Sequence, residues 1–219
     1  MAHKNGSLDQ QTFKKLSRLY VIALSAIAFS VIISQVLVRN HLDKQQSDST
    51  VINIAGRQRM LSQKLAKEVV FLSVYSDKKN RQSLKKAINE TLHLWELSHK
   101  ALQEGNDSLG LPKQNSVLIE RKFAAINPVF DGIQKSTFAI LQKLNRNILV
   151  PIELLSIDIN KINANESPFL VMMDDIVNQY NIEADEKIAW LRTLELSIMG
   201  LTILILLGEF LFIFWPTAK

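Results

Sequence analysis

Cysteine is absent from this chain of 219 residues, and glycine and proline are scarce, with 7 and 5 residues. The absence of cysteine excludes disulfide bonds and a cysteine nucleophile. The long central part of the chain also lacks runs of alternating polar and apolar residues, which mark half-buried strands. Apolar residues instead recur at intervals of three and four, so the sequence predicts an all-α fold.

The histidines, which often serve as general bases or metal ligands, are few and scattered. His3, His41, His93 and His99 show neither the spacing of a metal site nor an obvious partner for a catalytic base. His93 and His99 flank Trp95, where packing and surface roles are the ordinary ones. The sequence therefore predicts no enzymatic activity, no metal site and no cofactor.

A strong excess of one charge is also missing, although the formal net charge is +5 and the pI is about 9.4. Five basic residues belong to the two ends of the chain, namely Lys4, Lys14, Lys15, Arg18 and Lys219. Residues 39–193 carry 21 basic and 18 acidic residues, dispersed along the segment. This pattern is typical of a solvated surface, and we expect no binding of nucleic acid.

Two long apolar runs are the main feature that the sequence does contain. Residues 19–38 form an uncharged run of 20 residues, the length that a helix needs to cross a bilayer. Residues 194–215 form a second run in which only Glu195 and Glu209 are charged. We predict two transmembrane helices, and Glu209 is expected either to contact Ser25 or Ser30 of the first span or to lie at its cytoplasmic edge.

The flanking charges predict the orientation, because basic flanks tend to remain in the cytoplasm. Residues 1–18 and 216–219 are then cytoplasmic tails, and residues 39–193 form one periplasmic domain held at the inner membrane. A cleavable signal peptide is the alternative for the first run, but its apolar region would be shorter, about 7 to 15 residues, and would end in small residues.

The central segment is expected to form an antiparallel four-helix bundle whose first and last helices enter the membrane. The expected helices are residues 39–77, 81–103, 116–147 with a kink or break at Asn127-Pro128, 152–162, and one that begins at Ser167-Pro168 after a loop at 163–166. The last helix carries a heptad seam that continues into the second span: Leu170, Met173, Val177, Tyr180, Ala184, Lys187, Leu191 and Leu194.

The candidate site lies on the first helix beyond the membrane. On a helical projection Gln58 falls in the core stripe, whereas Arg59 and Gln63 lie on an adjacent face with the small residues Ala55, Ser62 and Ala66. A glycine inside a helix costs about 1 kcal/mol against alanine, so Gly56 is best explained by a close neighbour.

That neighbour is predicted to be the same helix of a second subunit. Two Arg59 side chains would then meet near a twofold axis, where a small anion such as nitrate or a carboxylate could bridge them and Gln63 could add an amide donor. In the alternative, Arg59 faces solvent or pairs with Glu90 or Asp174 of its own bundle.

The run Ala-Gly-Arg-Gln-Arg-Met-Leu-Ser-Gln-Lys at 55–64 resembles the signature of the type IV pili methyl-accepting chemotaxis transducer N-terminal domain. This domain, also called PilJ-like, is related to the sensor domain of nitrate/nitrite sensor kinases. Residues 169–174, with Tyr180, Glu183 and Ala184, are more loosely similar to the far end of the same domain. Residues 112–165 carry no recognisable motif.

The resemblance implies a membrane-bound sensor with a role in chemotaxis. In the nitrate-sensing relatives, the arginine three residues after the motif glycine binds the anion at a dimer interface, and Arg59 has this position relative to Gly56. The sequence departs from the nitrate sensors at Arg57-Gln58 and at 61–64, where it follows the PilJ-like pattern.

Since the chain ends at Lys219, a sensor of this kind is expected to signal through a separate cytoplasmic protein, or to be part of a longer kinase, cyclase or chemoreceptor. The alternative function is a structural membrane protein whose helical bundle binds a protein partner without a small ligand.

Overall fold

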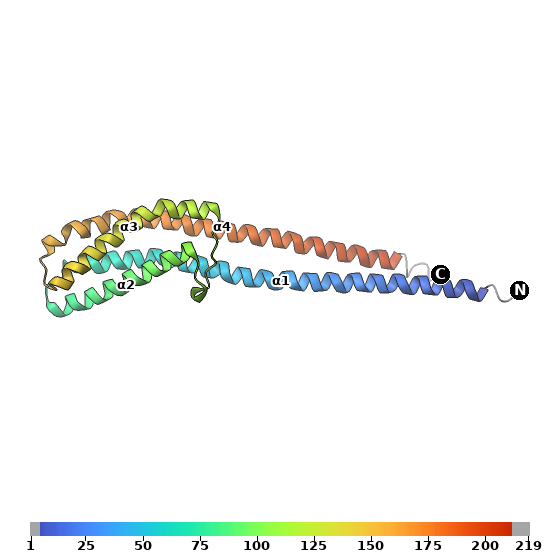
Figure 1. Cartoon of the computed structure of the whole chain (residues 1–219). Coiled ribbons are helices and arrows are strands. Elements are labelled where there is room, and N and C mark those ends of the chain that lie inside the picture. Colours follow the sequence, from blue (N-terminus) through green and yellow to red (C-terminus); the bar gives the residue numbers. More distant parts are fainter. Residues whose placement is uncertain (1–4, 212–219) are drawn as a thin grey trace. The chain divides into compact units, whose positions relative to one another are not determined.

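A computed structural model describes residues 5–211, which form four α-helices, two short 3-10 helices and no strand. The elements are α1 (Asn5–Phe71), α2 (Lys78–Glu104), η1 (Asp107–Leu109), α3 (Val117–Arg146), η2 (Ile152–Leu154) and α4 (Ser156–Glu209) (Figure 1). The predicted all-α fold is confirmed. The tail at 216–219 and the end of the second predicted span, at 212–215, lie outside the described residues.

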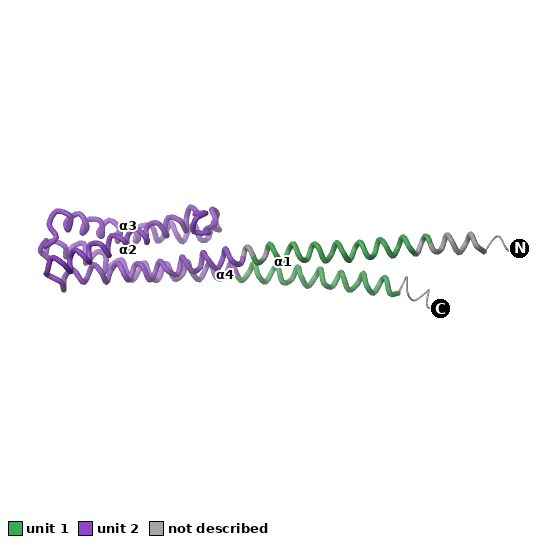
Figure 2. The backbone as a smooth tube through the Cα atoms, turned by 90° about the horizontal axis from the view of Figure 1, so that it is seen from below, with its two compact units in different colours: residues 1–44, 185–219 green, residues 45–184 purple. Residues whose placement is uncertain are grey.

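The chain divides into two compact units (Figure 2). Unit 1 combines Met1–Lys44 with Asp185–Lys219, and unit 2 comprises Gln45–Ala184. Helices α1 and α4 each contribute to both units, whereas α2 and α3 belong wholly to unit 2. Helices α1 and α4 are therefore the elements that connect the two units along the chain.

Unit 2 is built around one hydrophobic core to which all four helices contribute. Trp95 of α2 is fully buried, and its ring lies 4.2 Å from that of Phe130 on α3 and 5.0 Å from that of Phe169 on α4, measured between centroids. From α1 come Leu61, Leu65 and Val69, and Leu72 follows directly after the end of the helix; all four are at most 2% exposed. The predicted core stripe of the first helix is confirmed at these positions, and burial of each such side chain contributes about 1.5–3 kcal/mol.

Capping residues set the starts of α2 and α3. The side chain of Asp77 accepts a hydrogen bond from the backbone N–H of Asn80, so α2 begins at Lys78, one turn before the predicted start. This bond, with a second from the Asn80 side chain, lowers the pKa of Asp77. Ser116 caps α3 in the same way through the N–H of Ile119.

Two predicted interruptions of helices are absent. Helix α4 runs without a break through 163–166 and through Pro168, so the predicted loop and new N-terminus there are wrong. Helix α3 likewise continues through Pro128, so the predicted break is absent there, whereas a kink remains compatible with a continuous helix. An internal proline costs a helix about 3 kcal/mol. In α4 the fully buried side chains of Ile162 and Phe169, on either side of the proline, anchor both parts of the helix in the core and offset this cost.

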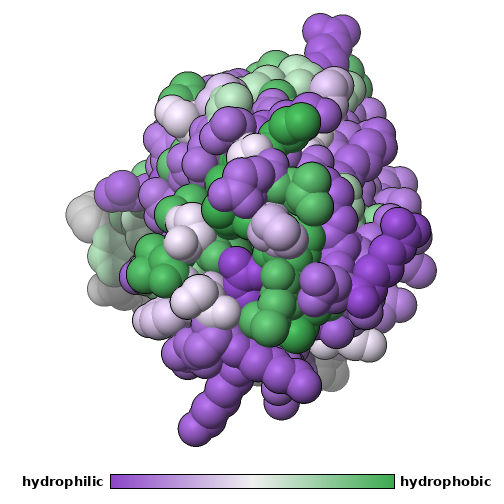
Figure 3. Space-filling view, turned by 90° about the vertical axis from the view of Figure 1, so that its left-hand side faces the viewer, coloured by the Kyte–Doolittle hydropathy of each residue, from purple (hydrophilic) through white to green (hydrophobic). Residues whose placement is uncertain are grey.

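One end of unit 2 holds the α1–α2 and α3–α4 connections, and a buried arginine joins them. Arg81 is 6% exposed and donates hydrogen bonds to the carbonyl oxygens of Leu72, Tyr75 and Val150. Hydrophobic side chains are exposed among hydrophilic ones on this end (Figure 3). They include Val74, Leu149, Leu154 and Ile157.

Unit 1 contains the two helical stretches that are long and apolar enough to cross a membrane. The apolar side chains of these stretches are not buried inside the protein, as expected for surfaces that face lipid. The Ser30 and Thr202 hydroxyls share a hydrogen bond of 2.6 Å. Ser25 donates a hydrogen bond to the carbonyl oxygen of Val21, and Oε1 of Glu209 has no hydrogen-bond partner within residues 5–211. The structure therefore shows no hydrogen bond between Glu209 and either serine, and the alternative position at the cytoplasmic edge stays a prediction.

Several polar groups are enclosed in the core of unit 2. Gln58 is fully buried, and neither its amide oxygen nor its amide nitrogen has a hydrogen-bond partner in the described part of the chain. The ring of His99 is 3% exposed, stacks on Phe130 with 3.8 Å between centroids, and shares a hydrogen bond of 2.9 Å with Asn127. The effect of each of these two side chains on the free energy of unfolding can be measured.

We expect Gln58→Leu to raise the free energy of unfolding by about 1–2 kcal/mol, because leucine has a similar volume and carries no polar atoms to desolvate. Chemical denaturation of the full chain in detergent, followed by circular dichroism, measures the change. The exposed Gln63→Leu is the control and should shift stability by less than about 0.5 kcal/mol. A loss of stability in Gln58→Leu would show that the amide makes favourable bonds.

Burial lowers the pKa of His99 from 6.5 to about 4, against smaller opposing effects of the Asn127 hydrogen bond and the Asp131 charge. The folded state therefore favours neutral imidazole, and stability present above pH 6.5 is lost as the pH falls toward 4. We expect His99 to account for about 3 kcal/mol of this loss. Denaturation at pH 7 and pH 4 should show a correspondingly smaller loss in His99→Phe, but not in the exposed control His93→Gln.

Candidate functional site

The motif at 55–64 lies on the part of α1 that belongs to unit 2. Arg59 is half-buried and Gln63 is exposed, whereas Ala55, Ser62 and Ala66 are buried within the chain's own bundle. The expectation that these small residues receive a helix of a second subunit is therefore wrong. A helix in a four-helix bundle packs against two neighbours, so its buried face is wider than one core stripe.

Arg59 forms an ion pair with Asp174 of α4, 115 positions away in the sequence. This is one of the intrachain pairings that the sequence left open; the other candidate, Glu90, pairs with Lys86 instead. The side chains of Arg59 and Asp174 are 39% and 65% exposed. An ion pair so open to water contributes at most about 1 kcal/mol. The Arg59 guanidinium is held in place, but weakly.

A surface hollow lies beside this ion pair. Its lining comes from α1 and α4: Gly56, Arg59, Met60, Gln63, Leu170, Val171 and Asp174. All three predicted site residues, Gly56, Arg59 and Gln63, are thus brought together at one place. Sequence reasoning missed Met60, Leu170 and Val171 as lining residues, since they carry no polar group that would mark them.

The helical environment of Gly56 is open. A Cβ atom added there would lie 3.8 Å from Nη2 of Arg59, an ordinary contact, with no second atom close by. The packing of this chain therefore does not require glycine at position 56. The absence of a side chain keeps the hollow accessible beside the Arg59 guanidinium.

The chemistry of the hollow is that of recognition. Its lining offers the planar donor group of Arg59 and the amide of Gln63, both suited to an oxyanion, together with the apolar side chains of Met60 and Leu170. Within residues 5–211 no group of three metal-ligating side chains occurs. Other acidic residues of α4 have structural partners: Asp175 pairs with Lys122, and Glu183 accepts a hydrogen bond of 2.6 Å from Ser116.

A second hollow lies between α2 and α3, lined in part by His93, Glu96, His99, Asn127 and Asp131. Its polar side chains bond one another: Gln134 donates to Glu96 at 2.8 Å, and Asn127 donates to Gln103 at 3.0 Å. These bonds fix α2 against α3. His99, at the base, is a packing residue, as the sequence predicted.

Comparison with known proteins identifies the family. The family model described as type IV pili methyl-accepting chemotaxis transducer N-term matches residues 41–151, about half of the chain. The match includes the motif at 55–64 and also 112–151, where the sequence showed no recognisable motif, but it ends before α4 and Asp174. No curated protein and no solved structure matches the chain significantly.

The matched family consists of signalling domains of chemotaxis transducers, and the two apolar helices fit an inner-membrane location. The predicted resemblance is confirmed. The chain belongs to the PilJ family of type IV pili methyl-accepting chemotaxis transducer N-terminal domains.

Proposed function

We propose that this protein is a membrane-bound sensor whose periplasmic domain binds a small anion at a homodimer interface and signals across the inner membrane. The observation that carries the proposal is the position of Arg59. This arginine lines an open hollow together with Gly56 and Gln63, and its only ion-pair partner in the described part of the chain is the exposed Asp174.

The Asp174 carboxylate supports the choice of ligand. A carboxylate and nitrate are both planar oxyanions, so the Asp174 carboxylate pairs with the Arg59 guanidinium as a small anion would. An anion in solution can compete with Asp174 because the exposed pair contributes little free energy. Gln63 would add an amide N–H donor, which a carboxylate side chain at that position could not supply.

Displacement of Asp174 gives a route for the signal. Arg59 belongs to α1 and Asp174 to α4, and both helices continue beyond unit 2 into the candidate membrane spans. Loss of the ion pair would remove one of the links between these two helices. A small shift of α4 against α1 is then the expected output, to be detected by a cytoplasmic signalling partner or a further domain.

A second copy of the chain would complete the site. One surface of α1 is not covered by the rest of the chain and carries Gly56, Arg59, Met60 and Gln63. Two α1 helices from different subunits can approach each other on this surface. Two guanidinium groups near a twofold axis repel each other unless an anion lies between them. Anion binding and dimerisation should therefore be coupled.

Arg59→Ala is expected to abolish the heat of anion binding while the fold is retained. Asp174→Asn should raise the affinity by up to about fivefold, because the competing carboxylate is removed. Calorimetry of the full chain in detergent with nitrate, nitrite and small carboxylates measures both effects.

Arg57→Ala is the matched control, because it removes an exposed guanidinium of the same helix that does not line the hollow. If the parent and Arg59→Ala give equal heats, Arg59 is not the anion ligand. If the parent gives no heat with any of these anions, the structural role with a protein partner is favoured.

Gly56→Ala separates dimerisation from folding. We expect it to raise the free energy of unfolding by up to about 1 kcal/mol, because alanine favours the helix and its Cβ has room. The same methyl group should weaken the dimer. Since the chain has no cysteine, a single cysteine at Gln63 allows disulfide crosslinking to report the dimer.

Asn53→Ala is the control for this change, since it improves helix propensity on an exposed position of α1 that does not line the hollow. The dimer interface is placed elsewhere if Gly56→Ala and Asn53→Ala give the same crosslinking yield as the parent.

A further inference from the structure

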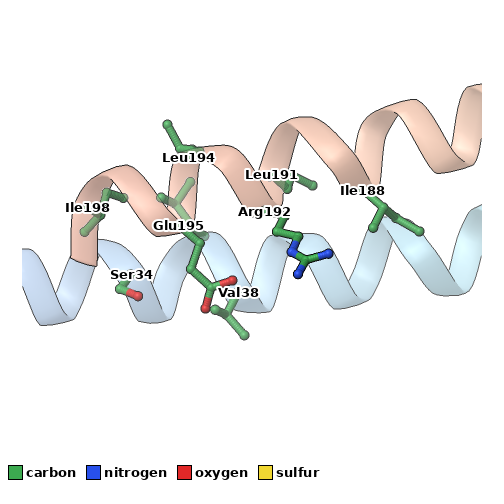
Figure 4. A pocket seen from close by; sticks show the side chains of 9 residues that line it. Ser34, Val38, Ile188, Leu191, Arg192, Leu194, Glu195 and Ile198 are labelled. Carbon is green, nitrogen blue, oxygen red and sulfur yellow. The ribbon is translucent and has the colours of Figure 1, made fainter. Parts of the chain in front are cut away.

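Unit 1 contains a narrow pocket of about 90 Å³ between its α1 and α4 segments (Figure 4). The lining is mainly apolar and comprises Ser34, Leu37 and Val38 of α1 and Ile188, Leu191, Arg192, Leu194, Glu195 and Ile198 of α4. The apolar walls continue into the exposed hydrophobic surface of the two candidate spans, which includes Val36, Leu196 and Met199. A ligand in this pocket can therefore extend along a lipid-facing surface.

Two opposite charges lie at the mouth of this pocket. The side chains of Arg192 and Glu195 both project from α4 toward α1 (Figure 4). Neither has an ion-pair partner among residues 5–211, and both side chains are exposed. Arg192 and Glu195 are three positions apart on one helix, so a single bound molecule could contact both.

The pocket lies at one end of the candidate spans. Val38 is the last residue of the uncharged run in α1, and Leu194 begins the apolar run of α4. Where hydrocarbon gives way to water, a bilayer presents phosphate and amine groups, and long charged side chains extend to this level. The charged mouth and the apolar walls thus match the two parts of a phospholipid.

We propose that this pocket binds a glycerophospholipid whose headgroup carries both a phosphate and a primary ammonium, as in phosphatidylethanolamine. The Arg192 guanidinium binds the phosphate with paired hydrogen bonds, and the Glu195 carboxylate accepts hydrogen bonds from the ammonium. One acyl chain packs against Leu37, Leu194 and Ile198. This inference rests on the proposed function, in which the two helices cross the bilayer.

The charge pattern distinguishes among headgroups. A phosphatidylglycerol headgroup keeps the phosphate but leaves Glu195 without a cation. A phosphatidylcholine headgroup has a cation but no N–H to donate, so Glu195 loses its hydrogen bonds. The lipid would touch both α1 and α4, the helices through which a signal must pass, and would hold them together at this level.

Native mass spectrometry of the full chain, released from detergent with equimolar phosphatidylethanolamine and phosphatidylglycerol, tests the headgroup. We expect about tenfold higher retention of phosphatidylethanolamine, with phosphatidylcholine in between. Glu195→Gln should reduce this preference to within about twofold, and Arg192→Leu should lower retention of all three lipids. Arg121→Leu, which removes an exposed guanidinium from α3, is the control and should behave as the parent.

Equal retention of phosphatidylethanolamine and phosphatidylglycerol by the parent would overturn the proposal, as would an unchanged preference in Glu195→Gln. Flotation with liposomes separates this failure from that of the proposed function. A chain that does not float is not anchored in the membrane, and both inferences fail. A chain that floats without a headgroup preference keeps its role as a membrane sensor and loses only the lipid site.

Discussion

The packing of Trp95 against Phe130 and Phe169 is the contact on which the rest of unit 2 depends. It brings α2, α3 and α4 to one level of the core, and the leucines of α1 close the remaining side. Such aromatic contacts contribute more than their buried area alone, because ring geometry is also matched. With the helices fixed in this register, Arg59 and Asp174 can meet although 115 positions separate them.

The hydrophobic core of unit 2 and the candidate site differ in their exposure to water. The core is closed and its apolar side chains are almost fully buried, whereas the Arg59–Asp174 pair is open to water and weak. In the proposed function, an anion would therefore replace Asp174 at Arg59 without disturbing the packing that holds the four helices. Sensors need such a separation, since a site whose occupation unfolded the bundle would transmit nothing specific across it.

The two units follow different physical rules although they share α1 and α4. In unit 2, apolar side chains avoid water by packing on one another, and the buried guanidinium of Arg81 is satisfied by backbone carbonyls. In unit 1 the apolar side chains remain exposed, and polar contacts such as Ser30–Thr202 join the two helices. This is the arrangement expected where lipid replaces water, because lipid gives apolar surfaces no reason to pack together.

The sequence by itself determined the helical class, the two apolar stretches, the core positions of α1 and the residues that mark the candidate site. These properties depend on local period, local hydropathy and a short motif, all of which can be read without knowing what lies nearby in space. Even where a boundary was predicted imperfectly, as at the start of α2, the capping residue Asp77 was visible in the sequence.

Only the tertiary structure decided the partner of Arg59, the burial of Ala55, Ser62 and Ala66, and the continuity of α4 through Pro168. Each of these depends on a neighbour distant in sequence. A helical projection of the sequence allows several acidic residues as partners of Arg59. The way in which the helices pack determines which of them forms the ion pair. A proline weakens a helix locally, but buried side chains on both sides of it stabilise the helix through contacts with other elements, which a local pattern does not contain.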